Sequence, residues 1–480
     1  MKKGEETVTL TKDEYDKLKS FEDQLAELKR LVFGSKSERF ISTEDADQLA
    51  LFQQGKQVED TSSQSITYER KKPAKDKKQP VRVLLPAHLP REEEIIEPEG
   101  LVEGVKKIGE EVTEILEHIP GKLYVRRIVR PKYVADDQKG VQIAQLPSLP
   151  IEKGNAGAGL LAHLQVSKFV DHLPFYRQVQ MFKREGVKLA ESTVNGWFNA
   201  SSQLLEPLYD RLVVLLKEQD YLQADESPIK VQDSHKKGST HKGYHWVYHS
   251  PLKKMAVFDY QPSRAGSNPT HFFKEFKGTL QTDGYAGYNQ LQEDITQLAC
   301  MAHARRYFEK ALDNDQQSAE HALKVIQSLY AIERDAEELD SNTRQQLREE
   351  KALPILKDWK VWLDEQQLAT TPKSLIGKAV NYTLNLWSRL IRYVDHGDYL
   401  IDNNRIENVI RPLALGRKNY LFAGSHDAAQ RAAMMYSFFA TCKINEVNPY
   451  EWLKDVLHRI PDHKVNDMDQ LLPQNWSIDH

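Results

Sequence analysis

The sequence predicts an α/β protein of several structural units, one of which includes a long helical stretch, and three observations support this prediction. Its 480 residues exceed the size at which one hydrophobic core keeps growing. Short β-rich and helical runs alternate between residues 221 and 302 in the order βββαβαβ. From His303 to Tyr393 the chain is rich in Gln, Glu and Leu, a composition that favours helices.

Composition excludes several classes of protein. A hydrophobic fraction of 40%, with 23 Gly and 21 Pro, is unlike collagen-like, low-complexity or wholly disordered chains. The two cysteines, Cys300 and Cys442, are too few for a disulfide framework, a four-cysteine zinc site or a four-thiolate iron–sulfur cluster. The N-terminus lacks the apolar core of a signal peptide, and the apolar run 432–442 is too short for a membrane span. We therefore expect a cytoplasmic protein with no membrane partner.

The charge of the chain is segregated. The net charge is only −4, which on average argues against a nucleic-acid partner. Residues 69–82, however, carry seven Lys or Arg and two acids, whereas residues 92–117 carry ten Glu. Between residues 403 and 443, cations again outnumber acids. Local basic surfaces are therefore compatible with the sequence.

Residues 1–35 are expected to form a leucine-rich helix. Leu18, Phe21, Leu25, Leu28 and Val32 follow the spacing of a coiled-coil seam, which suggests a homo-oligomer. An amphipathic helix that packs on its own domain explains the same spacing equally well. Residues 36–80 are polar and predict a flexible linker that ends in a basic run.

Two units are expected before the unit that contains the βββαβαβ run. Residues 81–155 contain β-rich runs such as 122–129 and predict a small β-rich module. Residues 156–217 predict a helix-turn-helix, in which Gly186 marks the turn and Ser192 caps the second helix. Ser192, Thr193 and Asn195 at the start of that helix are candidate DNA contacts. A plain helical hairpin fits the same pattern.

A mixed α/β unit is expected to span residues 218–440, with a helical stretch at about 304–395. Trp246 and Tyr248 lie in a predicted strand and are expected to be core residues. A short helix is expected after Asp402, and Pro412 should end or kink it. Residues 441–480 form a C-terminal element.

Three acids carry the predicted chemistry. Asp225 ends the first predicted strand and Asp283 ends the fourth, so both project from one sheet edge if those strands are neighbours. In the helix after Asp402, Glu407 shares a displayed face with Asn403 and Arg411. Three converging carboxylates need neutralising cations, and Mg²⁺ or Mn²⁺ suits oxygen ligands. The pattern predicts a metal site for phosphoryl transfer at Asp225, Asp283 and Glu407.

The chain resembles the transposases of the insertion-sequence 66 (IS66) family, a group of DDE transposases. The resemblance covers nearly the whole chain, and its most specific motifs are Asp225-Glu-Ser-Pro228, Gln281-Thr-Asp283-Gly-Tyr-Ala-Gly-Tyr288, Cys300-Met-Ala-His303-Ala-Arg305-Arg306, Ile401-Asp402-Asn-Asn-Arg-Ile-Glu407-Asn408 and Gly416-Arg-Lys-Asn-Tyr-Leu-Phe-Ala-Gly424-Ser425.

This resemblance implies that residues 218–440 are an RNase H-like catalytic domain with the acidic triad Asp225, Asp283 and Glu407. The helical stretch at about 304–395 then becomes an insertion between the last sheet strand and the helix that carries Glu407. It also implies transposon-end and target DNA as partners, together with small accessory proteins of the same element. The implied reaction frees a 3′-hydroxyl by hydrolysis and joins it to target DNA.

The sequence departs from the family in one module. Relatives carry paired zinc-binding cysteines before the helical region, but the matching stretches 97–109 and 131–138 contain no cysteine. We therefore expect a degenerate, metal-free β module, and zinc is not an expected cofactor. Cys300 and His303 have the spacing of a metal pair, yet no neighbouring residues complete a tetrahedral set.

Several cations are candidate DNA contacts near the acids. His303, Arg305 and Arg306 are expected to begin a helix beside the site, and Arg417 and Lys418 to lie in a loop after the Glu407 helix. Each could instead be an ordinary surface cation.

The aromatic residues Tyr285 and Tyr288 follow Asp283 closely enough to stack on a displaced base. Alternatives to a transposase are a catalytically inactive, transposase-derived DNA-binding protein, a scaffold protein and a nuclease that cuts without joining.

Overall fold

The structure is a computed structural model that describes residues 154–232 and 238–477, with residues 121, 123–126, 128, 132–134, 141–143 and 147–152. The described residues from 121 to 143 belong to one unit, and those from 147 onward belong to another. The predicted helix at 1–35, the linker at 36–80 and the first part of the β-rich module lie outside the described residues.

The described part of the smaller unit is a two-stranded antiparallel sheet of β1 (Lys132–Val134) and β2 (Val141–Ile143). The run 122–129 does not form the expected strand at its described positions, where Leu123–Arg126 are exposed and irregular. A β-rich sequence needs a neighbouring strand for its ladder bonds, and the described residues supply none to this run.

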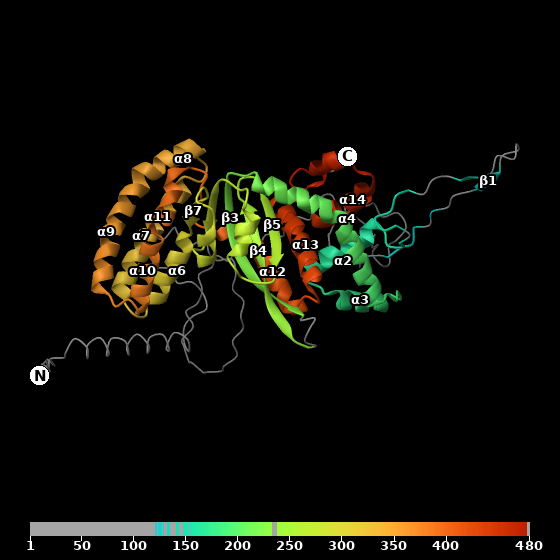
Figure 1. The fold of residues 1–480 in the computed structure, drawn as a ribbon, viewed down its shortest axis with the longest axis horizontal. Helices are drawn as coiled ribbons and strands as arrows, with labels where there is room; N and C mark the ends of the chain where they lie inside the picture. The colour runs from blue at the N-terminus through green and yellow to red at the C-terminus, as the bar shows by residue number, and fades with distance from the viewer. Residues whose placement is uncertain are drawn as a thin grey trace, which may run out of the picture. The chain divides into compact units, whose positions relative to one another are not determined.

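The larger unit is built on a five-stranded mixed sheet (Figure 1). Its strands are β3 (Tyr221–Gln232), β4 (Thr240–Ser250), β5 (Met255–Gln261), β6 (Thr279–Thr282) and β7 (Thr296–Ala299). The spatial order is β5-β4-β3-β6-β7, in which β3, β4 and β5 are antiparallel neighbours while β6 and β7 run parallel to β3.

The predicted order of elements holds with one change. The helix α5 (Ser267–Phe272) connects β5 to β6, as expected. Between β6 and β7 the chain forms the short 3-10 helix η2 (Ala286–Gln290) in place of an α-helix. Trp246 and Tyr248 are fully buried in β4, which confirms their prediction as core residues.

The helical insertion follows β7 and packs around a hydrophobic core of its own, on the β7 side of the sheet (Figure 1). It comprises α6 (Met301–Ala311), α7 (Gln316–Asp335), α8 (Ser341–Leu347), the π-helix η3 (Arg348–Ala352), α9 (Leu353–Ala369), α10 (Leu375–Asn385), α11 (Trp387–Leu390) and η4 (Ile391–Asp395).

The remaining helices pack on the β5 side of the sheet in the view of Figure 1. They are α2 (Ala158–Phe169), α3 (Phe175–Arg184), α4 (Glu191–Lys217), α12 (Asn404–Tyr420), α13 (His426–Ile444), α14 (Pro449–Arg459), η5 (Ile460–Asp462) and η6 (Val465–Leu471). Within the described part of the chain, no helix combines the length and hydrophobicity needed to cross a bilayer.

Two predicted helix boundaries are wrong. The second helix of the helix-turn-helix region begins one residue after Ala190, its N-cap, so Ser192 lies in the first turn and is not the cap. Pro412 was expected to end or kink its helix; it lies inside α12, so the expectation that it ends the helix is wrong. The buried residues Ile410 and Leu413 on either side of Pro412 anchor the helix in the core, and this burial offsets the lost backbone hydrogen bond.

Candidate active site

The register of the sheet brings Asp225 and Asp283 together. The last parallel pair between β3 and β6 joins Gln223 to Gln281. Asp225 and Asp283 each follow two residues later, so they lie side by side where β6 ends. The condition under which the two carboxylates were expected to lie together, that their strands are neighbours, is therefore met. Asp225 is not at the end of its own strand, however, because β3 continues to Gln232 through its pairing with β4.

Where the chain leaves the insertion, buried polar side chains of β3 and β6 hold it beside the two aspartates. The Gln223 side chain donates to the carbonyl of Asp402 (2.9 Å), and the Gln281 side chain donates to the carbonyl of Leu400 (2.7 Å). The Tyr221 hydroxyl accepts from the backbone N–H of Leu400 (3.1 Å). These bonds fix the start of α12, the helix that carries Glu407, against β3 and β6.

The electrostatics of Asp225 show how closely the acids approach. Burial raises the pKa of this carboxyl to about 8, and the negative charges of Glu226, Asp283 and Glu407 add to the increase. One hydrogen bond from the backbone N–H of Glu226 (2.7 Å) opposes it. Asp283 and Glu407 therefore lie close enough to Asp225 for their charges to oppose its ionisation.

Glu226 is a fourth acid at the site that the sequence reasoning missed. Its side chain is 2% exposed, and Arg264 donates to it from Nε at 2.7 Å and also from Nη2. The Tyr288 hydroxyl donates to its other oxygen at 3.2 Å. Strand alternation places Glu226 on the opposite face from Asp225, which is why the spacing gave no signal.

Glu407 lies against two side chains of α6, the cation Arg306 and the imidazole of His303. Arg306 Nη2 lies 2.7 Å from Glu407 Oε2, and His303 Nε2 lies 4.0 Å from Oε1. Burial, followed by the charge of Arg306, lowers the pKa of His303 below its ordinary value. The structure thus brings His303 and Arg306 to the acids. Arg305 instead forms an ion pair with Glu309 at 3.5 Å within the same helix.

The other predicted DNA contacts have different surroundings. Arg417 and Lys418 lie within α12, not in the expected loop. Arg417 donates to the Ser227 hydroxyl (2.9 Å) and the Pro228 carbonyl (2.6 Å), so it ties α12 to β3, whereas Lys418 is exposed. Ser192, Thr193 and Asn195 are exposed on the first turns of α4.

Two further interpretations need correction. Tyr288 is fully buried and bonded to Glu226, so it has no free face on which a base could stack. One face of the Tyr285 ring carries the Arg264 guanidinium at 3.7 Å. Asn403 is fully buried and is therefore not displayed beside Glu407. The N-cap position of a packed helix accounts for this burial.

The donor set suits a hard divalent cation in its chemistry. It consists of carboxylate oxygens, and the repulsion that raises the pKa of Asp225 is what such a cation would relieve. Among the described residues, no three His, Cys, Asp or Glu side chains are already arranged to hold a metal ion. The carboxylate of Glu407 is paired with Arg306 of α6.

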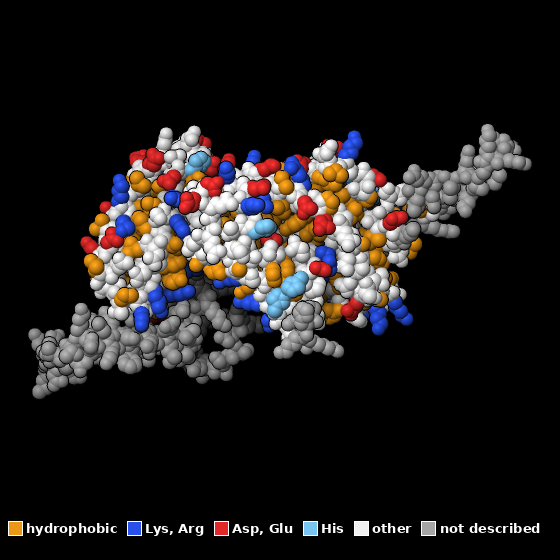
Figure 2. All heavy atoms as spheres, viewed as in Figure 1, with side chains coloured by type: hydrophobic (Ala, Val, Ile, Leu, Met, Phe, Trp, Pro, Cys, Tyr) orange, Lys and Arg blue, Asp and Glu red, His pale blue; other side chains and the backbone are white. Residues whose placement is uncertain are grey.

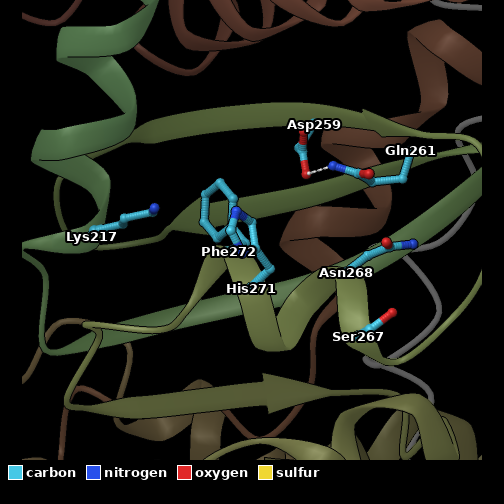
Figure 3. Close-up of a pocket in the computed structure, with 7 residues that line it drawn as sticks. All are labelled: Lys217, Asp259, Gln261, Ser267, Asn268, His271 and Phe272. Carbon is cyan, nitrogen blue, oxygen red and sulfur yellow. Dashed lines mark hydrogen bonds between the residues drawn. The ribbon is translucent and has the colours of Figure 1, made fainter.

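Charged side chains are unevenly distributed over the surface of the molecule. In Figure 2, Lys and Arg side chains gather along the lower edge of the face shown, while acids are more frequent along its upper edge. A cavity of about 530 Å³ lies between α4, β5 and α5, away from the acids (Figure 3). It is lined by Lys217, Asp259, Gln261, Ser267, Asn268, His271 and Phe272. No predicted site residue contributes to it.

Comparisons with known proteins place the chain in a family. Residues 153–431 match the model described as Transposase IS66 family, and residues 437–474 match the IS66 C-terminal element. Residues 20–93 match a model described as Transposase C of IS166 homeodomain. The chain belongs to the IS66 transposase family.

Curated relatives match over most of the chain. The uncharacterized protein y4jD of Sinorhizobium fredii is 31% identical, over 95% of this chain and 94% of its own length. The uncharacterized protein y4qI of the same organism is 31% identical, over 94% of this chain and 88% of its own length. No solved structure matches the chain.

Proposed function

We propose that this protein is a DDE-type DNA transposase, which binds the ends of its insertion sequence, hydrolyses a phosphodiester and transfers the freed 3′-hydroxyl to target DNA. The observation that carries the proposal is the convergence of Asp283 and Glu407 on Asp225: the register of β3 and β6 sets Asp283 beside Asp225, and after burial and Glu226 the charges of Asp283 and Glu407 add to the raised pKa of Asp225. The strand order β5-β4-β3-β6-β7, with acids on β3, after β6 and on the helix after the sheet, supports an RNase H-like catalytic domain.

Each acid has a distinct part in this proposal. Asp225 on β3 and Asp283 directly after β6 would hold a divalent cation, and Glu407 would complete the set from α12. When bound, Mg²⁺ or Mn²⁺ supplies the positive charge that activates the attacking oxygen and stabilises the leaving one. Arg306 and His303, which now hold Glu407, would then lie beside the scissile phosphate.

DNA engagement is proposed along several elements. The exposed Ser192, Thr193 and Asn195 would contact the element end, in the manner of a helix-turn-helix. Two ends must be held together for transfer, so we propose a homo-oligomer on DNA, with accessory proteins of the element as further partners. Arg417 is left out of the proposed DNA contacts, because its guanidinium is bonded to β3.

The test is a cleavage and joining assay. Full-length protein is incubated with Mg²⁺, labelled duplex of its own element end and target DNA, alongside Asp283→Asn. We expect metal-dependent nicks at the element end and joined products with the wild type. The substitution should abolish both, because it removes one carboxylate charge while keeping the side-chain shape. Unchanged binding of the end by Asp283→Asn is the control for folding.

Three results would contradict parts of the proposal. Nicks without joined products would make the protein a nuclease. Specific binding of the end without cleavage, in the presence of the accessory proteins, would make it a DNA-binding derivative of a transposase. Cleavage that survives Asp283→Asn would show that the acids on this sheet edge are not the catalytic ones.

A further inference from the structure

The loop after α12 holds an exposed leucine in a strained conformation. Leu421 has φ 64° and ψ −43°, and the Phe422 N–H donates to the Tyr420 carbonyl at 2.8 Å, which closes a γ-turn. This turn is rare and strained for a residue with a side chain. Leu421 is nevertheless 64% exposed and Phe422 is 44% exposed, so burial of their side chains does not offset the strain.

The turn is held rigidly from both sides. Ala423 donates to the Lys230 carbonyl and accepts from the Gln232 N–H, each at 2.8 Å, which joins the loop to the far end of β3. The Ser425 hydroxyl then caps α13 through the N–H of Ala428 at 3.1 Å. An apolar tip is thus fixed between the strand that carries Asp225 and the helix that carries Glu407.

The exposed face of α12 leads from the acids to this tip. Asn404, Asn408, Arg411, Leu415 and Lys418 are exposed at helical spacing, so they form one stripe along the helix. The stripe contains amides, cations and one leucine but no acid, since Glu407 is the one acid in α12. Amide and cationic side chains are those that bind phosphates and base edges.

We propose that this stripe follows duplex DNA away from the cleavage site and that Leu421 and Phe422 insert between base pairs at its far end. This inference rests on the proposed function. Apolar wedges that unstack a base step are fixed in position and flanked by cations, as the tip is here. Fourteen residues separate Glu407 from Leu421, or about 21 Å of helix, which corresponds to about 6 base pairs of duplex beside it.

The experiment uses 2-aminopurine, a base whose fluorescence rises on unstacking. The base is placed at single positions within about 3 base pairs on either side of the estimated distance of about 6 base pairs from the cleaved phosphate. Full-length protein is titrated onto this duplex of its own element end. We expect a several-fold rise in fluorescence confined to positions near the middle of the window. Asp283→Asn should give the same rise without cleavage, because the tip does not take part in the chemistry.

The double variant Leu421→Gly, Phe422→Ser tests the tip itself. Glycine accepts the positive φ without strain, so the variant should melt no lower than the wild type. It should bind the end while losing the fluorescence rise. Leu252→Ala, which alters a half-exposed leucine in the turn between β4 and β5, is the matched control and should keep the rise. Lys418→Ala should weaken binding and lower the salt dependence by about one phosphate contact, yet keep the rise at saturation.

The outcomes separate this inference from the proposed function. A fluorescence rise that persists in the double variant overturns the wedge. Wild-type protein that cuts the end with no rise at any probed position also overturns it, while the proposed function stands. Wild-type protein that neither binds nor cuts its own end overturns both.

Discussion

Arg306 competes with a metal ion for Glu407, and replacing it should tighten metal binding. Its guanidinium lies 2.7 Å from Glu407 Oε2, and no three acids or histidines of the described chain are arranged to bind a metal while this pair persists. The substitution Arg306→Gln removes the charge and keeps a polar side chain of similar reach. Glu407 would then be free to turn toward Asp225 and Asp283.

The exposure of the pair sets the size of the effect. The two side chains are 33% and 32% exposed, so the pair resembles a surface ion pair more than a buried one. Such pairs contribute about 0.2 to 1 kcal/mol, and releasing Glu407 should therefore strengthen Mn²⁺ binding by up to about fivefold.

Calorimetric titration of Mn²⁺ into full-length protein measures this change. Arg305→Gln is the matched control, because it removes the same charge from the neighbouring position of α6, where the side chain pairs with Glu309. We expect tighter binding for Arg306→Gln and little change for Arg305→Gln. Equal effects of the two substitutions would show that general charge, and not the ion pair with Glu407, controls the site. Weaker binding by Arg306→Gln would refute the competition outright.

Two further predictions concern stability. Arg348 is fully buried, forms a bidentate pair with Glu333 (2.8 and 2.6 Å) and donates to three backbone carbonyls, so Arg348→Met should destabilise the insertion by about 3 to 5 kcal/mol in denaturant unfolding. A loss below about 1 kcal/mol would mean that these bonds contribute little net stability. Burial raises the pKa of Asp259 from 3.8 to about 6, so the folded state holds a proton that the unfolded state loses, and stability falls as the pH rises between these values. The free energy of unfolding of Asp259→Asn should therefore equal that of the wild type near pH 4 and exceed it by up to about 3 kcal/mol at pH 7. A difference in melting temperature that is equal at both pH values would contradict this cause.

The acidic edge could be predicted from the sequence because it depends on short-range pattern. Asp283 directly follows a short buried strand, and parallel strands end at one edge, so the adjacency of Asp225 and Asp283 follows once β3 and β6 are neighbours. The length of β3 could not be predicted in the same way. Its second half is a strand because β4 pairs with it as far as Thr240. That pairing is a tertiary interaction, which the local sequence of β3 does not reveal.

The cations show where sequence reasoning reaches its limit. Arg305 and Arg306 are equally close to the site in the sequence, but adjacent helical positions point about 100° apart. Only the packing of α6 decides that Arg306 faces Glu407. Arg417 was expected in a loop because Gly416 resembles a turn residue. A Cβ at Gly416 would lie 2.5 Å from the Tyr436 hydroxyl, so this glycine permits a close helix contact and does not end the helix.

The insertion can occupy about a hundred residues between β7 and α12 without displacing Glu407, because its two ends are bonded to each other. The N–H of Met301, where the insertion begins, donates to the carbonyl of Ile401, where it ends, at 3.1 Å. Closing a longer loop costs little additional entropy once its ends are fixed, and the insertion has its own core to stabilise it. The helix that opens it also contributes His303 and Arg306 to the acidic edge. The insertion is therefore coupled to the proposed chemistry at its base, through α6, and substitutions there should change cleavage more than substitutions in α8 or α9, which lie farther along the chain from the acids.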